Sequence, residues 1–237
     1  MTDLQSQAIA ERLDAVRGEI RAAEARWNRP PGSVALLAVS KRHSVAAIEA
    51  AMAAGQTAFG ENYLQEAEEK RQALADADIE WHFIGPLQSN KTRAVAEGFD
   101  WVHAVDRLKI AQRLSAQRPS ELAPLNCCIQ VNVSGEASKS GVAPDAVTAL
   151  AHEVAALPGL RLRGLMTLPE AVHEFEAQRA AFRQLRELQE TLIQQGLNLD
   201  TLSMGMTNDL EAAIAEGATL VRIGTAVFGQ RPEKTHE

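Results

Sequence analysis

The sequence predicts a single barrel of eight parallel strands surrounded by helices, a (β/α)₈ barrel. The run VALLAVSK at residues 34–41 is apolar until Ser40 and Lys41, as expected for a strand buried on both faces. Strand-like and helix-like stretches alternate from this run onward, which indicates a parallel sheet. A chain of 237 residues that is 46% hydrophobic suits one such domain, which commonly has about 250 residues.

A helix is expected at residues 3–27, ahead of the barrel. Five apolar residues are spaced along it for one buried stripe: Leu4, Ile9, Leu13, Val16 and Ile20. Pro30, Pro31 and Gly32 end it. We expect residues 1–29 to pack on the barrel as an added helix, and residues 1–237 to form one domain.

The remaining elements follow in order. The predicted strands are residues 34–41, 58–60, 80–85, 101–105, 125–133, 160–167, 199–203 and 219–223. The predicted helices are residues 44–54, a stretch rich in Glu, Lys and Ala ending near 75, residues 89–97, 107–117, one begun by Pro144, 171–195 and 208–216.

A doubly wound sheet is the alternative fold. It would more usually have about five to seven strands and a glycine fingerprint after the first, and no GxGxxG follows Val39.

Charge and composition narrow the class of protein. A formal net charge of −7 argues against a nucleic-acid surface, which normally carries a positive excess. The first residues, MTDLQSQAIAERLDAV, lack the apolar block of a signal peptide or membrane span, so we expect a cytoplasmic protein without a membrane partner. Cys127 and Cys128 are expected to be reduced core residues. No spacing of ligand residues resembles a metal site.

Lys41 is the first charge after a buried strand. The carboxyl ends of parallel strands form the mouth at which barrels carry out chemistry, and a partly desolvated amine there can form a Schiff base with an aldehyde. The alternative is a solvated lysine that merely ends the strand.

The last two strands are followed by small residues that let backbone amides approach an anion. Ser203 and Gly205 precede a helix whose start is marked by Asn208 and Glu211, a predicted capping pair, and Gly224 and Thr225 follow the eighth strand. Phosphate binding by these loops is a recurring barrel solution. Ordinary tight turns are the alternative.

Arg222 lies in an otherwise apolar strand, where a charge needs a partner. One such partner is the ring nitrogen of a cofactor. An amine, a phosphate cradle and a ring-nitrogen partner together suit pyridoxal 5′-phosphate (PLP).

Seven segments in order resemble the signatures of the pyridoxal phosphate homeostasis protein family, the single-domain relatives of the N-terminal barrel of alanine racemase. They are VALLAVSK, FGENYLQE, WHFIGPLQSNK, VNVSGEASKSG, LRGLMTLP, LSMGMTNDLEAAIAEG and VRIGTAVFG. The resemblance implies a fold-type III barrel in which Lys41 holds PLP as an internal aldimine and Arg222 faces the pyridine nitrogen. It further implies that phosphate is bound by Ser203, Gly224 and Thr225, and that the cavity is lined by Asn62, Met204, Gly205 and Met206. Arg42 and His43 depart from the family pattern of Thr and Lys followed by Pro.

Two functions follow from the resemblance. The first is a carrier or buffer in intracellular PLP homeostasis, with PLP-dependent apoenzymes as recipients and no catalytic residue of its own. The second is an amino-acid racemase. Racemisation needs an acid/base group opposite the lysine, which alanine racemase takes from a second domain of the partner subunit, and we expect no such domain here. The same expectation favours a monomer.

Other residues receive weaker interpretations. A sugar-phosphate aldolase would also suit the barrel, but no acid/base group is evident beside Lys41. Lys139, in the loop SGEASKSG, is a candidate for a secondary, transient PLP site or a solvated loop lysine. His82 is expected to be a hydrogen-bonded interior histidine, and His103 and His152 are assigned no chemistry.

Overall fold

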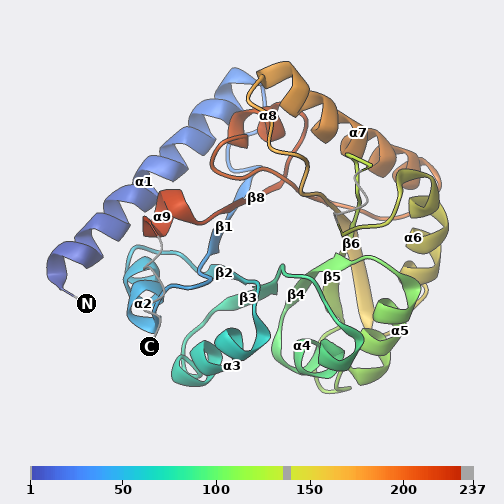
Figure 1. The fold of residues 1–237 in the computed structure, drawn as a ribbon, viewed down its shortest axis with the longest axis horizontal. Helices are drawn as coiled ribbons and strands as arrows, with labels where there is room; N and C mark the ends of the chain where they lie inside the picture. The colour runs from blue at the N-terminus through green and yellow to red at the C-terminus, as the bar shows by residue number, and fades with distance from the viewer. Residues whose placement is uncertain (1, 136–139, 231–237) are drawn as a thin grey trace.

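A closed barrel of eight parallel strands, in the order β1 to β8, forms the centre of the computed structural model, which describes residues 2–135 and 140–230. Figure 1 looks into the ring of strands, with the helices outside it. The strands are β1 Ala35–Val39, β2 Ala58–Glu61, β3 Glu80–Phe83, β4 Trp101–Val105, β5 Leu125–Gln130, β6 Leu160–Met166, β7 Thr201–Ser203 and β8 Leu220–Ile223. Because β8 pairs with β1, the ring closes. The predicted (β/α)₈ barrel is confirmed, and the doubly wound sheet is wrong.

The helices of the described residues lie on the outside of the ring. They are α1 Asp3–Arg26, α2 Val45–Ala53, α3 Leu64–Ala73, α4 Thr92–Gly98, α5 Leu108–Gln117, α6 Val147–Ala155, α7 Phe175–Gln194, α8 Leu210–Ala215 and α9 Thr225–Phe228, with 3₁₀ turns η1 Ser89–Lys91 and η2 Pro144–Ala146. The added helix α1 crosses the outside of the barrel and contacts α2, α8 and α9 (Figure 1). It therefore covers the seam at which β8 meets β1.

Helix α1 is fixed at both ends. Thr2 begins it with a capping box to Gln5. At its far end the buried carboxylate of Glu24 accepts hydrogen bonds from the backbone N–H groups of Gly32 and Val34, at 3.0 and 2.9 Å. The predicted apolar stripe is buried except for Leu4, which is 78% exposed. Glu24 thus ties the end of α1 to the entry of β1.

Two helix starts differ from prediction. Helix α7 begins at Phe175, four residues after the predicted start, because the preceding segment forms a loop in which the Glu170 N–H donates to Ser134 Oγ at 3.1 Å. The predicted capping pair before α8 is wrong. The N-cap is Asp209, and Glu211 instead accepts a hydrogen bond from Trp27 Nε1 at 3.2 Å.

The barrel interior is partly polar. The hydrophobic side chains inside it form two small clusters separate from the main core, and they are Leu37, Val39, Ile84 and Leu220 in one and Trp101, Cys128 and Met166 in the other. Both cysteines are buried and free, as predicted, and they lie on opposite faces of β5, because Cys127 belongs to the main core between strands and helices. Polar side chains fill the rest of the interior: Glu80, His82, His103, Ser203 and Arg222.

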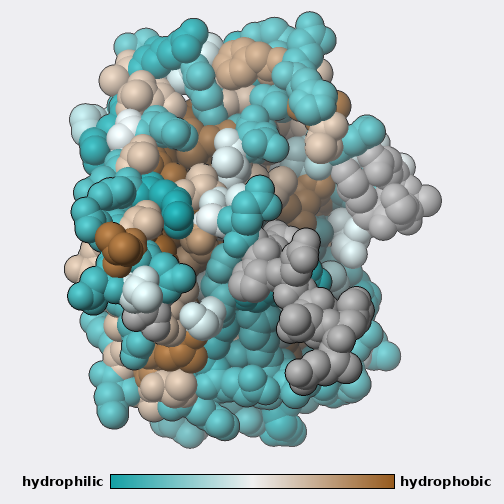
Figure 2. Space-filling view, turned by 60° about the vertical axis from the view of Figure 1, so that its left-hand side comes forward, coloured by the Kyte–Doolittle hydropathy of each residue, from teal (hydrophilic) through white to brown (hydrophobic). Residues whose placement is uncertain are grey.

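The outer surface is mixed in character. Figure 2, in which the side carrying α1 comes forward, shows hydrophobic side chains as separate spots among hydrophilic ones. Within the described residues, no helix combines the length and apolar character needed to cross a membrane.

Candidate functional site

Lys41 lies in the turn that follows β1, at the mouth of the barrel. Strand β1 pairs Val39 with Gly60 of β2 and Leu37 with Arg222 of β8. Lys41 therefore lies between β2 and β8. It comes four residues after Leu37 and two after the end of β1, and so lies beyond the level of Arg222 on the side of the mouth. Its side chain is partly exposed. The predicted lysine thus follows the strand that pairs with the strand of the predicted arginine.

A buried lysine that sequence reasoning missed holds the turn before Lys41. The Lys70 ammonium group on α3 donates to the Ser40 carbonyl at 2.7 Å, to Glu61 Oε1 at 2.7 Å and to Glu66 Oε1 at 2.6 Å. Lys70 is 4% exposed. The spacing of Glu66 and Lys70 by four residues on a helix was the available signal. The cluster anchors the backbone directly before Lys41.

Glu61 forms the buried acidic part of this cluster. Its Oε1 also accepts a hydrogen bond from the Ser40 hydroxyl at 2.6 Å. Burial raises the pKa of Glu61, and the positive charge of Lys70 opposes that rise. Its second oxygen, Oε2, is buried and has no hydrogen-bond partner among the described residues. The carboxylate therefore depends on Lys70 for its compensation.

The two residues that depart from the family pattern pack against aromatic rings. Arg42 has a φ of 64°, in the left-handed region that is uncommon for a residue with a side chain, and its N–H donates to Glu66 Oε1. Its guanidinium lies 5.6 Å from the centre of the Tyr63 ring. His43 stacks on Phe228 of α9, with ring centres 4.9 Å apart. Both side chains therefore pack against aromatic rings beside the turn that carries Lys41.

Arg222 is buried inside the barrel, at 4% exposure. Its NH1 donates to Ser203 Oγ at 2.6 Å and its NH2 to the Thr167 carbonyl at 2.7 Å. Burial lowers the pKa of Arg222 to about 10, while the nearby Asp209 acts in the opposite direction. Arg222 is therefore a cation at neutral pH. The two bonds use two of the five guanidinium N–H groups, so others can serve a ligand.

The Ser203 side chain, which the resemblance assigns to phosphate binding, has two partners inside the barrel. Its side chain is fully buried, and its hydroxyl bonds to Arg222 and to His103 Nδ1, the latter at 2.8 Å. Binding phosphate through this hydroxyl would require these bonds to be given up. In this structure the Ser203 side chain holds the guanidinium of Arg222.

The glycines of the last two loops stand where side chains would not fit. Gly205 has a φ of 97°, and a Cβ on it would come within 2.6 Å of Ala213 Cβ. A Cβ on Gly224 would lie 3.2 Å from the Val39 carbonyl oxygen. The backbone at Gly224 and Thr225 therefore passes close beside the strand that carries Lys41. Thr225 also begins α9, and the first N–H groups of a helix have no partner within it and can bind an anion.

The two methionines of the loop after β7 differ in exposure. Met204 is fully buried in the main hydrophobic core, so its side chain does not line the mouth. Met206 is 39% exposed, and its N–H donates to the Asp209 carboxylate at 2.5 Å. Burial raises the pKa of Asp209, and the Met206 N–H and Arg222 oppose the rise. Asp209 is a neighbour of the site that the sequence analysis did not single out.

Asn62 lies at the end of β2 and lines a cavity of about 280 Å³ at the mouth, together with Ile84, Pro86, Gln130, Ser140, Leu168 and Pro169. Its Oδ1 is buried and has no hydrogen-bond partner among the described residues. Gly85 packs against the Asn62 backbone, since a Cβ there would lie 2.2 Å from the Asn62 carbonyl oxygen. An unpartnered amide oxygen beside a cavity is suited to a polar ligand.

Two histidines, His82 and His103, are hydrogen-bonded to each other inside the barrel. His82 is an interior hydrogen-bonded histidine, as predicted. His103, which was assigned no chemistry, joins His82 to Ser203. Its position two residues after the start of β4 gives it the same inward direction as Trp101. His152, by contrast, is exposed on α6 and bonds to Gln195.

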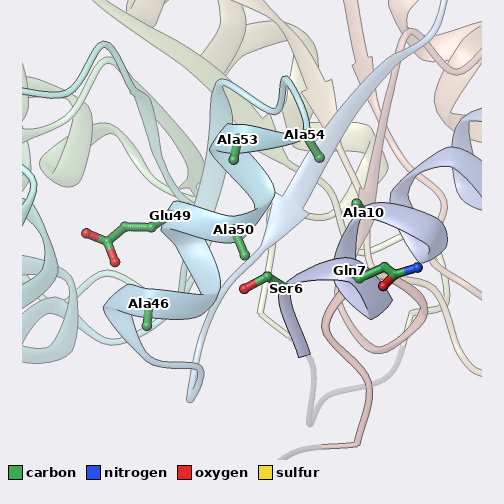
Figure 3. Close-up of a pocket in the computed structure, with 8 residues that line it drawn as sticks. All are labelled: Ser6, Gln7, Ala10, Ala46, Glu49, Ala50, Ala53 and Ala54. Atoms are coloured by element: carbon green, nitrogen blue, oxygen red, sulfur yellow. The ribbon is translucent and has the colours of Figure 1, made fainter. Parts of the chain in front are cut away.

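A groove on the outside of the barrel is unrelated to this chemistry. It lies between α1 and α2 and is lined mostly by alanines, with Ser6, Gln7 and Glu49 (Figure 3). Of the residues that line this groove, Glu49 alone is titratable. The mouth, with Lys41, Arg222 and Asn62, is therefore the candidate site. Lys139 lies outside the described residues.

The fold and mouth define the class of protein. The family profile described as "Alanine racemase, N-terminal domain" matches residues 12–232. Alanine racemase from Corynebacterium glutamicum superimposes with a TM-score of 0.69 at 19% identity, over 98% of this chain and 63% of that one. At this identity the likeness concerns the fold alone. The class is a barrel of the alanine racemase N-terminal type.

Relatives of higher identity cover nearly the full chain. The pyridoxal phosphate homeostasis protein of Pseudomonas aeruginosa is 63% identical over 94% of this chain and 96% of its own length. The pyridoxal phosphate homeostasis protein of Escherichia coli K12 is 53% identical over 94% of this chain and 97% of its own length. PipY of Synechococcus elongatus, solved with PLP bound, superimposes with a TM-score of 0.81 at 40% identity. The match covers 93% of this chain and 100% of the PipY chain. The chain belongs to the pyridoxal phosphate homeostasis protein family.

Proposed function

We propose that this protein binds one PLP at the barrel mouth and serves intracellular PLP homeostasis as a carrier or buffer. The observation that carries the proposal is the placement of Lys41 above Arg222 on adjacent strands, with the backbone of Gly224 passing beside them. When bound, PLP supplies an aldehyde that condenses reversibly with amines and an aromatic ring that can withdraw electrons. The same cofactor is present in the solved structure of PipY.

The residues fit the parts of this molecule. PLP has its aldehyde and its ring nitrogen at opposite ends of the pyridine ring, which suits an amine above and a guanidinium below. Lys41 would hold the aldehyde carbon covalently, and Arg222 would donate an N–H to the ring nitrogen. The backbone at Gly205, Gly224 and Thr225 would bind the phosphate. Asn62, whose buried Oδ1 lacks a partner, would bind a polar group near the ring.

Arg222 argues for a carrier and against strong catalysis. A guanidinium only donates, so a ring nitrogen bonded to it stays unprotonated. Because Arg222 is cationic and held in place by Ser203 and Thr167, it cannot adapt to a protonated ring. A less electron-withdrawing ring weakens racemase, transaminase and decarboxylase chemistry alike.

Tyr63 does not fill the role of an opposing acid. It is the single tyrosine of the sequence, its side chain is 47% exposed, and its ring lies beside the Arg42 guanidinium. A racemase would need an acid/base group on each face of the substrate. Amino-acid racemisation therefore stays the second candidate function, favoured by the shared barrel and not by a residue of the mouth.

Two measurements on purified protein test the proposal. The first is the molar ratio of bound PLP to protein, measured from visible absorbance and total phosphate. We expect one PLP per chain. The second follows exchange of deuterium into the α-carbon of D- and L-alanine, and then transfer of bound PLP to an apo-transaminase. We expect transfer with negligible exchange. Exchange near the median enzyme turnover of about 10 per second would instead establish a racemase.

A further inference from the structure

A chain of hydrogen bonds crosses the barrel interior beneath the mouth. It joins side chains from β3, β4, β7 and β8. In order, the links are Arg222 NH1 to Ser203 Oγ at 2.6 Å, Ser203 Oγ to His103 Nδ1 at 2.8 Å, His103 Nε2 to His82 Nδ1 at 2.9 Å and His82 Nε2 to Glu80 Oε1 at 2.8 Å. The function proposed above uses Arg222 alone of these five residues.

The ionised carboxylate of Glu80 fixes the direction of these hydrogen bonds when both imidazoles are neutral. Glu80 can only accept, so His82 carries its proton on Nε2 and donates to it. His82 Nδ1 then accepts from His103, which carries its proton on Nε2. His103 Nδ1 accepts in turn from the Ser203 hydroxyl, whose oxygen accepts from Arg222. Each imidazole is thereby confined to one neutral tautomer.

The surroundings keep both imidazoles neutral. His82 is 1% exposed and His103 is fully buried. Burial lowers the pKa of His82, against the attraction of Glu80 and Asp100. Burial also lowers the pKa of His103 well below its usual range, and the neighbouring His82 and Arg222 act in the same direction. The hydrogen bond from His82 lowers the pKa of Glu80, which is therefore ionised at neutral pH.

Hydrophobic neighbours hold the rings in their planes. Trp101 stacks on His82 with ring centres 5.3 Å apart and an interplanar angle of 8°. Trp101, Cys128 and Met166 form the buried cluster inside this half of the barrel. An interior usually filled by branched aliphatic side chains thus carries a fully bonded polar chain, in which a misplaced proton would leave a buried group unpaired.

The two end residues of this hydrogen-bond chain, Glu80 and Arg222, lie toward opposite faces of the barrel. Glu80 is the first residue of β3, and its side chain is 51% exposed. Arg222 lies on β8 next to β1, the strand that Lys41 follows at the mouth. We propose that Glu80, His82, His103 and Ser203 are positioning residues that hold Arg222 as a fixed donor at the mouth and couple its guanidinium to the charge of Glu80 on the opposite face. The part concerning a ring nitrogen rests on the proposed function, whereas the coupling itself does not.

The first test uses the wild-type protein without cofactor. Long-range ¹H–¹⁵N spectra of the histidine rings report which nitrogen carries the proton. We expect His82 and His103 to be neutral at pH 7, each protonated on Nε2. A His103 ring protonated on Nδ1, or a charged ring at either position, overturns the proposal. This result requires no substitution, so it stands even if a variant does not fold.

The second test removes the charge of Glu80 and keeps its shape. Glu80→Gln is compared with Glu97→Gln, whose glutamate is 47% exposed and pairs with Arg93 on α4. We expect E80Q to shift the ¹⁵N resonances of the His103 ring and of the Arg222 guanidinium, and E97Q to leave both in place. A shift confined to His82 in E80Q would show that the charge is not transmitted, and the coupling would be rejected.

The third measurement connects the chain to the ligand. After loading with PLP, the visible absorption maximum is expected to shift in E80Q and to match wild type in E97Q. An unchanged maximum in E80Q would reject the effect of Glu80 at the mouth. If neither wild type nor variants take up PLP, the proposed function fails, while the spectra of the cofactor-free protein still decide the hydrogen-bond chain.

Discussion

Lys41 owes its position to residues on either side of it in the turn. The Ser40 carbonyl accepts from Lys70, and the Arg42 N–H donates to Glu66. Backbone bonds immediately before and after the lysine hold the backbone that carries it. Because the attachment point is already fixed, less conformational entropy is lost when the lysine binds an aldehyde covalently.

Lys41→Ala is expected to abolish the visible absorption band of bound PLP and the adduct that borohydride reduces, because the covalent attachment is lost. Lys109→Ala, which removes an exposed lysine on α5, should retain both. Mass spectrometry of the reduced, digested wild-type protein locates the adduct. A full-occupancy adduct on a lysine other than Lys41 would contradict the assignment.

Lys70 is expected to be the residue on which the mouth depends for stability. Lys70→Met leaves Glu61 buried without its cation, and the free energy of unfolding should fall by about 3–5 kcal/mol at pH 8. The double variant Glu61→Gln with Lys70→Met should recover much of this loss, because no buried charge is left uncompensated. Urea denaturation followed by circular dichroism measures both.

The same variant should show a pH dependence of known sign. Burial raises the pKa of Glu61 above its usual 4.5 in the folded protein. A carboxyl with a raised folded pKa favours folding at low pH, and this contribution is lost as the pH rises through the folded pKa. Without Lys70 the pKa rises further, so Lys70→Met should be less destabilising at pH 5.5 than at pH 8. An equal loss at both values would show that Glu61 finds another partner.

Among the elements, α1 is the one that a barrel does not require. Its buried stripe packs against α2, α8 and α9, and Glu24 joins its end to β1. Helices with one apolar stripe gain most of their stability from such packing and little from intrinsic propensity. We therefore infer that α1 folds as part of the same cooperative unit as the barrel.

Leu13→Ala tests this inference. Leu13 is fully buried on α1, so its truncation should lower the free energy of unfolding by about 2–5 kcal/mol in one cooperative transition. Leu4→Ala, on the same helix but 78% exposed, should change it by no more than about 0.5 kcal/mol. A separate early transition in thermal unfolding, assigned to α1 by helical signal, would argue that the helix is independent.

At the scale of the whole molecule, the distribution of exposed hydrophobic residues favours a monomer. The large hydrophobic side chains that are exposed among the described residues belong to different helices and loops, and they are Leu4, Tyr63, Leu122, Leu168, Ile193 and Met206. Stable dimers usually bury a continuous hydrophobic patch. We propose that the mouth is complete within one chain.

Sedimentation equilibrium should therefore give a mass near the 25.6 kDa of one chain, with and without PLP. The reason is that each predicted ligand-binding residue comes from this chain. Measurement over a tenfold range of protein concentration distinguishes a monomer from a weak dimer. A concentration-independent mass of two chains would contradict this prediction and would call for a search for site residues across the interface.

The sequence by itself determined the order of elements and the residues at the mouth. Hydrophobic periodicity is a local property, so it correctly predicted α1, the eight strands and the helices between them. The rule that parallel strands end at one mouth then brought together Lys41, Asn62, Arg222 and Gly224. The register that sets Arg222 level with Leu37 agrees with that expectation.

The tertiary structure alone decided how these residues are held. Ser203 and His103 are 100 residues apart in the chain, and Lys70 and Ser40 are 30 apart, yet both pairs are hydrogen-bonded. Such partners depend on which strands become neighbours in the ring and on which face of each strand a residue occupies. A periodic pattern gives the face but not the neighbour. For that reason the sequence identified the lysine and the arginine, while the buried groups that position them became visible only once the barrel had closed.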